Sequence, residues 1–169
     1  MISYTSITPE STKFSYISGY FDSRLVNQWL ADIEKWHSKE ARQKAYETIE
    51  NINSGTDIMM SLSQDDSLLA ICSYMTITSR LRLSMISDID KNLAPKEIVE
   101  AIRKNGVIFI YRLAGSGQGG GRQIIEDLQL MSRVRGRPIF LNSTDNARGF
   151  YEKMGFKNID GTRHYYYLT

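Results

Sequence analysis

Five glycines occur within seven positions of the segment "GVIFIYRLAGSGQGGGRQIIEDL", residues 106–128. They are Gly115, Gly117, Gly119, Gly120 and Gly121. A glycine backbone can approach an anion closely, and the first amides of a following helix point at it, aided by the positive end of the helix dipole. The pattern predicts a phosphate-binding turn between a strand and a helix. It leaves open a triphosphate, a dinucleotide, coenzyme A or no ligand.

The residues beside the glycines distinguish among these ligands. A triphosphate loop needs a lysine and then Ser or Thr after its last glycines, whereas Arg122 and Gln123 stand here. Residues 115–120 match the dinucleotide pattern G-x-G-x-x-G, but that fold also needs an acidic residue about 20 positions later. The apolar run "PIFLN" occupies that place and ends without one. The triphosphate is therefore excluded, and the dinucleotide is a weak candidate.

The segments before the glycines predict helices followed by strands. Four apolar residues recur at helical spacing: Leu25, Trp29, Ile33 and Trp36. They predict one long helix or two successive helices over residues 23–51, with Asp22 or Ser23 as a cap. "IMMSLSQ" and "SLLAICSYMTIT" predict two strands joined by the polar turn "QDDS". "SRLRLSMISDIDKNL" fits no single element, and "APKEIVEAIRKNG" predicts a short amphipathic helix.

The glycines themselves lie between a predicted strand and a predicted helix. "VIFIYRLA" is continuously apolar over most of its length, which predicts a strand buried on both faces. A helix from Gly121 to about Arg135 follows, and "PIFLN" is the next buried strand. "STDNARGFYEKMGF" predicts a helix with Ala147, Phe150 and Met154 directed inward. The Asp-Gly turn in "FKNIDGTRHYYYLT" predicts a terminal hairpin. The class is α/β, with a central mixed sheet flanked by helices.

Composition limits the function classes. The 169 residues are 41% hydrophobic, which is enough for one core, so we expect a single domain over residues 1–169. A net charge of +2 does not by itself indicate nucleic-acid binding. The single cysteine, Cys72, permits no disulfide within the chain and favours a reducing, cytoplasmic compartment. The N-terminal residues do not resemble a secretory signal, and no apolar run is long enough to span a bilayer, so we expect neither feature. His37 and His164 stand alone, so no metal site is expected.

Two blocks carry a resemblance to a known family. "SGQGGGRQIIEDL", then a strand and then "STDNARGFYEKMGF" resemble the GNAT superfamily of acetyl-CoA-dependent N-acetyltransferases. In that superfamily a strand leads into the motif Q/R-x-x-G-x-G/A, and a later helix reads A-x-x-F/L-Y-x-x-x-G-F. The resemblance implies the GNAT fold, with the glycine-rich turn after the central strand. It also implies acetyl-CoA as co-substrate and no metal.

The resemblance assigns roles to residues of this chain. The turn that would bind the pyrophosphate of acetyl-CoA comprises Ser116, Gly117, Gln118, Gly119, Gly120, Gly121 and Arg122, with Ser116 in place of the usual Gln or Arg. The strand end at Leu113 and Ala114 would face the pantetheine arm, and Asn142 would lie beside it. Tyr151 is the expected general acid, because a phenol can donate a proton to a departing thiolate. The alternative is that Tyr151 only packs beside Phe150.

A finer resemblance concerns the GNAT toxins of toxin-antitoxin pairs. It rests on "FSYISGYFDSRLVNQWL", "SYMTITS" and "LAPKEIVEAIRKNGVIFIYRLAG". Members of this group acetylate the amino group of aminoacyl-tRNA. The resemblance implies aminoacyl-tRNA as the amine acceptor, an antitoxin protein as a partner, and a homodimer as a common assembly. A protein amine, a small amine and a catalytically silent CoA-binding module remain alternatives.

The basic run "RVRGR" contains Arg133, Arg135 and Arg137 at the end of the glycine helix. Such cations commonly stabilise a helix C-terminus, by a few tenths to about 1 kcal/mol each. They can equally contact the 3′-phosphate of coenzyme A or an RNA backbone. The sequence does not decide among these three roles.

Overall fold

The computed structural model describes residues 2–5, 13–17, 23–52, 55–90 and 92–169. It divides into two compact units. Unit 1 comprises Met1–Tyr74 and Arg112–Ile125, and unit 2 comprises Met75–Tyr111 and Glu126–Thr169. Strands β4 (Leu68–Ile77) and β5 (Val107–Gly115) and helix α5 (Gly120–Arg135) each begin in one unit and end in the other.

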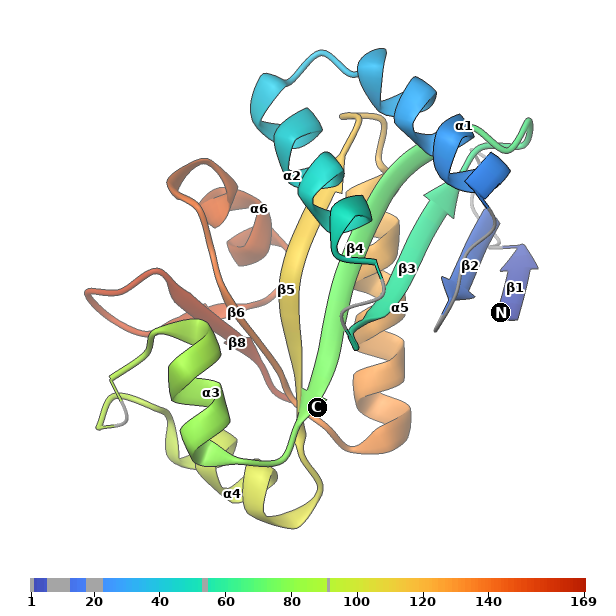
Figure 1. Ribbon diagram of the computed structural model, residues 1–169. Coiled ribbons are helices and arrows are strands. Elements are labelled where there is room, and N and C mark those ends of the chain that lie inside the picture. The colour runs from blue at the N-terminus through green and yellow to red at the C-terminus, as the bar shows by residue number, and fades with distance from the viewer. Residues whose placement is uncertain (1, 6–12, 18–22, 53–54, 91) are drawn as a thin grey trace. The chain divides into compact units, whose positions relative to one another are not determined.

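Unit 1 is built on four antiparallel strands that lie side by side in chain order (Figure 1). They are β1 (Ile2–Thr5), β2 (Lys13–Ile17), β3 (Asp57–Leu62) and β4 (Leu68–Ile77). The register of β3 against β4 pairs Ile58 with Ser73 and Met60 with Ile71, with an irregularity between Ser61 and Leu62. The two predicted strands and the turn between them are confirmed.

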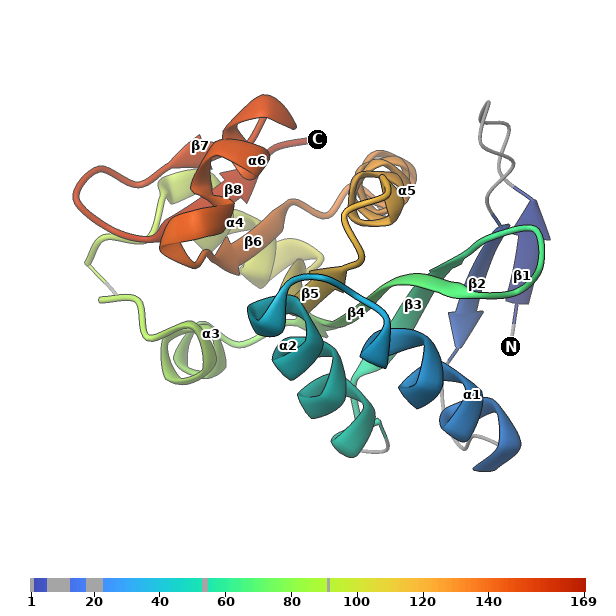
Figure 2. The same cartoon turned by 90° about the horizontal axis from the view of Figure 1, so that it is seen from above.

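Two helices cover one face of these strands, as Figure 2 shows for β3 and β4. They are α1 (Ser23–Glu34) and α2 (Lys39–Glu50), so the predicted helical region is two helices rather than one. Ser38 caps α2, because its hydroxyl accepts a hydrogen bond from the amide of Ala41 at 3.1 Å. Ser23 is the first residue of α1, and the other predicted cap, Asp22, lies outside the described residues. The buried tryptophans and isoleucines of this helical region pack against Ile58, Met60 and Ile71.

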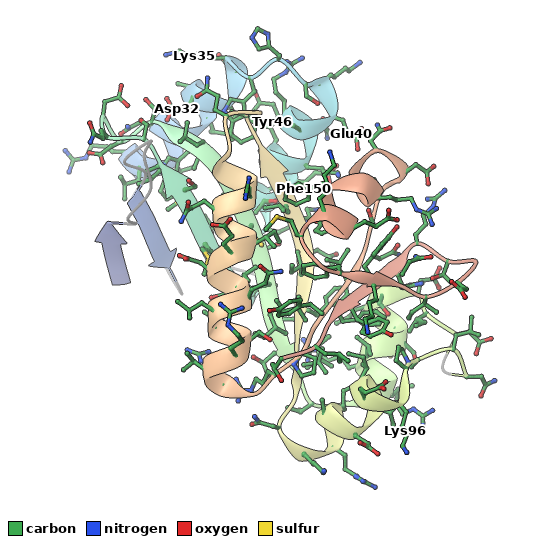
Figure 3. All side chains as sticks on the ribbon, turned by 180° about the vertical axis from the view of Figure 1, so that it is seen from behind. Asp32, Lys35, Glu40, Tyr46, Lys96 and Phe150 are labelled. Atoms are coloured by element: carbon green, nitrogen blue, oxygen red, sulfur yellow. The ribbon has the colours of Figure 1, made fainter. Side chains whose placement is uncertain are left out.

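Polar side chains tie the end of α1 to the turn between β3 and β4. The Asp32 carboxylate, labelled in Figure 3, accepts a hydrogen bond of 2.9 Å from the amide of Leu68. The indole Nε1 of Trp36 donates to the carbonyl of Leu68 at 3.3 Å. Gln28 donates to the carbonyl of Asp66. These bonds satisfy backbone groups where β4 begins, so the start of that strand has a fixed position within unit 1.

Unit 2 contains a mixed sheet in the order β5, β6, β8, β7. β5 runs parallel to β6 (Ile139–Asn142), with pairs from Ile108↔Ile139 to Ile110↔Leu141. β8 (His164–Tyr167) is antiparallel to β6, and the two-residue β7 (Lys157–Asn158) is antiparallel to β8. The predicted terminal hairpin is confirmed. Its tight turn runs from Ile159 to Thr162, with Gly161 at φ +78° as a type II turn requires.

Helices pack on both faces of this second sheet. On one face, Leu83 of α3 (Arg80–Ser87) and Ile98 and Ile102 of α4 (Lys96–Lys104) pack with Phe109 and Phe140. The segment "SRLRLSMISDIDKNL", which fitted no single element in the sequence, contains helix α3. On the other face lies α6 (Arg148–Lys153), which follows a short 3₁₀ turn, η1 (Asp145–Ala147). The class is therefore α/β with a mixed sheet flanked by helices, as predicted.

Two expectations about burial are wrong in part. β5 is fully buried from Val107 to Ile110, but Tyr111 is 45% exposed, so the strand is not buried along its whole length. In the helix after β6, the predicted inward residues Ala147, Phe150 and Met154 are only half-buried, and the buried residue is Tyr151. The predicted helix is in fact a 3₁₀ turn, Asp145–Ala147, followed by the six α-helical residues of α6, so a single α-helical spacing does not run through the segment.

The described part of the chain has no helix that is long and apolar enough to cross a membrane. Within that same part, no group of three or more His, Cys, Asp or Glu residues is arranged to hold a metal ion.

Candidate cofactor site

The glycine-rich turn leaves β5 at Gly115 and enters α5 at Gly120. Its first anchor is a hydrogen bond of 2.8 Å from the amide of Ser116 to the carbonyl of Leu69 in β4. Gly117 and Gly119 then adopt φ values of +90° and +85°, which L-residues with side chains rarely adopt. These two glycines therefore allow the chain to reverse within the few residues between strand and helix.

Gly120 is required for a different reason. A Cβ atom at this position would lie 2.9 Å from Cβ of Leu69 and 3.0 Å from Cβ of Ala70, well inside van der Waals contact. The first turn of α5 can lie against β4 only because residue 120 has no side chain. A Cβ at Gly121 would meet no atom within 4 Å. Open space therefore lies beside the second residue of the helix.

The start of α5 presents backbone donors. The first amides of an α-helix have no carbonyl four residues earlier within the helix. Here Gln123 is the first residue whose amide is bonded to such a carbonyl, that of Gly119 at 3.2 Å. The amides of Gly120 and Gly121 come before that bond, at the positive end of the helix dipole. Gly117, Gln118 and Gly119 are exposed, so the turn is accessible to an anion.

Ser116 supplies a side-chain group beneath this turn. Its hydroxyl is buried and has no hydrogen-bond partner among the described residues. A buried hydroxyl without a partner costs free energy, commonly 1–3 kcal/mol. An anion held by the turn is one partner that could remove this cost. The exposed glycine amides, the open side of Gly121 and this hydroxyl together fit a pyrophosphate group.

The predicted contacts of the pantetheine arm lie just before the turn. Ala114 is buried in the core of unit 1, whereas Leu113 is half-buried. The preceding residue, Arg112, forms an ion pair with Glu47 of α2 at 3.3 Å. The strand end is thus held by α2 and by the core within unit 1. Leu113, Ala114 and the turn from Ser116 to Arg122 form one continuous segment of that unit.

Asn142 lies in unit 2, at the end of β6. Its side-chain amide donates to the carbonyl of Ser87 at 3.1 Å, and Nε2 of His164 donates to the same carbonyl at 2.7 Å. The ladder between β5 and β6 ends at Leu141, one residue earlier. The side-chain amide of Asn142 is therefore hydrogen-bonded to the last residue of α3. The backbone of Asn142 comes directly after the last pair between β5 and β6.

Tyr151 lies in unit 2 on α6 and is 6% exposed. Its ring packs edge-on against Phe150 at 5.2 Å and Phe156 at 5.5 Å between centroids, and lies 6.3 Å from the ring of Tyr165. Figure 3 labels the neighbouring Phe150 on the same helix. This packing is compatible with Tyr151 as a general acid and with Tyr151 as a packing residue alone, since a proton donor also needs its ring held in place. On the sheet, Tyr165 and Asn142 face opposite sides, because β6 and β8 pair Leu141 with Tyr165 and Asn142 with His164.

A polar network that our sequence analysis did not predict supports this aromatic cluster. The hydroxyl of Tyr165 donates to Glu152 at 2.8 Å and accepts from Nε of Arg148 at 3.1 Å. The phenol beside Arg148 raises the pKa of that guanidinium, so Arg148 stays charged. The spacing of Arg148 and Glu152, four residues apart on a helix, was the available signal. The residue they share, Tyr165, comes from a strand and could not be read from that spacing.

Comparisons with known proteins agree with this geometry. Residues 101–165 match the family model described as the acetyltransferase (GNAT) domain. No curated protein sequence matches the chain. Among solved structures, the chain is similar to the Bacillus subtilis N-acetyltransferase YlbP in complex with coenzyme A, at 14% identity and a TM-score of 0.52, covering 94% of this chain and 97% of that one.

Structures of the toxin AtaT are also similar. One is a tyrosine-to-phenylalanine mutant bound to the C-terminus of the antitoxin AtaR and acetyl-CoA, at 11% identity and a TM-score of 0.57, covering 94% of each chain. Another is AtaT complexed with acetyl-methionyl-tRNAfMet, at 12% identity and a TM-score of 0.55, covering 94% of this chain and 95% of that one. The predicted resemblance is confirmed: residues 101–165 match the GNAT family model, and the chain has the GNAT fold.

Proposed function

We propose that this protein is an N-acetyltransferase that transfers the acetyl group of acetyl-CoA to a primary amine, and that this amine is the amino group of an aminoacyl-tRNA. The observation that carries the first part is the glycine turn. It combines exposed amides at a helix N-terminus, an open side at Gly121 and the buried hydroxyl of Ser116. This arrangement matches what a pyrophosphate needs, and the GNAT fold uses such a turn for acetyl-CoA.

Residues of the turn would bind the co-substrate, and neighbouring residues would act on it. When bound, acetyl-CoA supplies the acetyl group as an activated thioester. The backbone amides from Gly117 to Gly121 would bind the pyrophosphate, and Arg122 would add charge at its edge. A backbone amide at Leu113 or Ala114 would donate to the carbonyl oxygen of the acetyl group, where negative charge develops during attack.

Tyr151 would move the proton that the leaving group needs. The acceptor amine forms a bond to the acetyl carbon, the carbon–sulfur bond breaks, and the Tyr151 hydroxyl gives its proton to the sulfur. The amine loses one proton to water, and Tyr151 recovers one from water, so the charges balance. A phenol is suited to this step because its ordinary pKa is near 10, only slightly above that of a thiol. The aromatic cluster around Tyr151 would hold the hydroxyl in one place.

We choose aminoacyl-tRNA as the acceptor because of the resemblance of this chain to other proteins. The first helix and the "RLA" strand end resemble GNAT toxins, and a solved structure of similar fold is a toxin complexed with an acetylated aminoacyl-tRNA. By the same likeness we propose an antitoxin protein as partner and a homodimer as assembly. A single domain over residues 1–169 and a cytoplasmic location stay predictions.

The variant Tyr151→Phe tests the catalytic step. It removes one hydroxyl and keeps the ring that packs on Phe156 and Tyr165. We expect kcat to fall by about 10²-fold or more, the range for loss of a positioned acid, with the KM for acetyl-CoA unchanged. The matched control is Tyr46→Phe on α2, a half-buried tyrosine of unit 1 shown in Figure 3. A Tyr151→Phe enzyme as fast as the control would refute the assignment.

An acceptor screen tests the substrate. Labelled acetyl-CoA is offered with aminoacyl-tRNA, a polyamine, a lysine peptide or a peptide with a free N-terminus. Faster transfer to aminoacyl-tRNA supports the proposal, and faster transfer to a peptide or polyamine supports a protein or small-amine acetyltransferase instead. Ser116 in place of Gln or Arg favours one further alternative, a silent CoA-binding module. That module would show a rise in Tm with acetyl-CoA but no transfer to any acceptor.

A further inference from the structure

Unit 2 carries a cluster of cations that the proposed chemistry does not use. Arg103 and Lys104 lie in the last turn of α4, and Arg133 and Arg135 lie in the last turn of α5. Arg137 follows two residues after α5 ends. We call these five residues the basic helix-end surface. Arg137 is half-buried, and the other four are exposed.

Reciprocal caps hold the two helix ends together. The side-chain amide of Asn105, the residue after α4, donates to the carbonyl of Arg135 at 2.7 Å. In return, Nε of Arg137 donates to the carbonyl of Asn105 at 2.9 Å. Gly136, at φ +66°, turns the chain out of α5 as a residue beyond a helix C-terminus commonly does. These side-chain-to-backbone bonds therefore hold together, within unit 2, the two helix ends that carry the five cations.

Carboxylates are missing from these segments. Residues 101–110 and 128–144 contain no Asp or Glu. Within the described part of the chain, none of the five cations makes an ion pair, and Arg133 is bonded to a neutral group, the hydroxyl of Tyr167 at 2.9 Å. The whole chain has a net charge of only +2, whereas these two segments alone carry five cations and no Asp or Glu.

Helix stabilisation alone does not account for this charge. Cations near a helix C-terminus do offset its dipole. Here, however, one carbonyl at each helix end already receives a cap, from Asn105 in one case and from Arg137 in the other. Among the residues that the structure describes, the side chains of Arg103, Lys104 and Arg135 find no such bond. Their charges face solvent and are available to a partner.

A groove continues the basic surface from Arg103. It has a volume of about 610 Å³ and contains one carboxylate, Glu100, among its lining residues. Arg80 and Lys96 line it together with Arg103, and Figure 3 shows Lys96 at the start of α4. The groove thus adds two cations to the same side of α4 and extends the path along which a polyanion could lie.

The 3′-phosphate of coenzyme A is too close to the glycine turn to be the partner. α5 has 16 residues and is therefore about 24 Å long, at 1.5 Å per residue. The pyrophosphate would lie at the first residue of that helix, and Arg133 and Arg135 lie in the last turn. The 3′-phosphate sits on the ribose joined directly to the pyrophosphate, so it cannot extend along the whole helix. A ligand that touches the basic end must be larger.

We propose that the basic helix-end surface binds the phosphodiester backbone of an RNA acceptor. The identity of that RNA, an aminoacyl-tRNA, rests on the proposed function. RNA carries one negative charge at every nucleotide, which suits a surface where seven cations, the five of the helix ends and Arg80 and Lys96 of the groove, outnumber the one groove carboxylate, Glu100. Arginine and lysine side chains bind phosphates without reading the bases, so we expect the contact to be independent of sequence. The surface holds the body of the RNA, and base-specific recognition is not expected of it.

The test replaces three cations whose loss spares both caps. The triple variant Arg103→Gln, Lys104→Gln and Arg135→Gln keeps Asn105 and Arg137. Its control, Lys35→Gln, Lys39→Gln and Lys157→Gln, changes exposed lysines elsewhere and removes the same charge. Binding of deacylated tRNA is measured by fluorescence anisotropy over a range of NaCl concentrations. Far-ultraviolet circular dichroism and the Tm of both variants establish that they fold.

We expect the slope of log affinity against log salt to become shallower by about 2 to 3, since each lost phosphate contact removes 0.7–0.9. Affinity near 0.1 M salt should fall roughly ten-fold or more, and acetylation of a small amine should not change. The control should bind tRNA like the wild type. A slope equal to that of the wild type in the triple variant would overturn the inference.

Two further outcomes keep this inference separate from the proposed function. If the wild type acetylates aminoacyl-tRNA and the triple variant does so with the same KM, the inference fails and the proposed function stands. If the triple variant loses tRNA binding but the wild type acetylates only other amines, RNA binding stands and the acceptor assignment fails. Poly-L-glutamate offers the other class of partner. If the triple variant loses poly-L-glutamate binding while its tRNA binding persists, the surface recognises an acidic protein and the inference is wrong.

Discussion

Replacing Gly120 with alanine should separate steric from conformational reasons for the glycines of the turn. In Gly120→Ala the new methyl group would lie 2.9–3.0 Å from Leu69 and Ala70 of β4, so the strand or the helix must move. The nearest atoms include the backbone carbon of Leu69, which cannot rotate away as a side-chain tip can. Overpacking of this kind commonly costs 1–3 kcal/mol. The free energy of unfolding should fall by about that amount.

Gly121→Ala is the matched control, one residue along the same helix. Its methyl group would meet no atom within 4 Å, and the position does not need a positive φ. Alanine is the better helix former, so this variant should be as stable as the wild type or more stable, by up to about 1 kcal/mol. The two variants should differ by roughly 2 kcal/mol, which is about 1 M in the midpoint of urea unfolding for a typical slope.

Urea unfolding followed by circular dichroism measures that difference, and a thermal scan with acetyl-CoA adds a functional reading. Gly120→Ala should gain less Tm from acetyl-CoA than the wild type, because a displaced helix start moves the amides that would bind the pyrophosphate. If Gly120→Ala is as stable as Gly121→Ala, helix α5 does not lie against β4 as described, and the steric argument is wrong.

Two further predictions concern half-buried carboxyl groups. Burial raises the pKa of Asp127 on α5 to about 6, above the value near 3.9 of an unfolded chain, so the folded chain holds this proton more tightly. The free energy of unfolding should therefore decrease as pH rises from about 4 to above 6. Asp127→Asn should remove about 1 kcal/mol of that decrease, after allowance for screening of a half-exposed group, as measured by urea unfolding at several pH values. Asp32→Ala removes the acceptor of the Leu68 amide and should cost about 1–3 kcal/mol at pH 7, whereas Asp32→Asn, which keeps an acceptor oxygen, should cost less.

Local sequence patterns predicted most helices and strands, because the residues whose spacing forms each element lie close together in the chain. The spacing of Trp29 and Ile33 made α1 amphipathic, and the Asp-Gly pair fixed the terminal turn. A pattern failed where a distant contact decided the outcome. Tyr151, rather than Phe150, is buried on α6, where its ring packs on Phe156 and lies near Tyr165 of β8. No periodicity within the fourteen-residue segment records that contact.

The candidate site likewise has features that could be predicted from the sequence and features that only the structure shows. The order of strand, glycines and helix could be read from the sequence, because each glycine marks a position that a side chain would hinder. The reason differs between positions, and only the structure distinguishes the left-handed Gly119 from Gly120, which must avoid β4. The bond between Asn142 and the carbonyl of Ser87 joins residues 55 apart and could not be inferred.

By itself, the sequence determined the α/β class, the glycine turn after β5 and the resemblance to GNAT acetyltransferases. These depend on the order and spacing of residues along the chain. Tertiary structure decided that Ser116 has a buried hydroxyl without a partner, and that Arg103, Lys104 and the arginines of "RVRGR" form one surface. The physical reason is that burial and charge clustering depend on groups distant in sequence, here two helix ends joined through Asn105. The arginine run that had three possible roles in the sequence therefore has one proposed role in the fold.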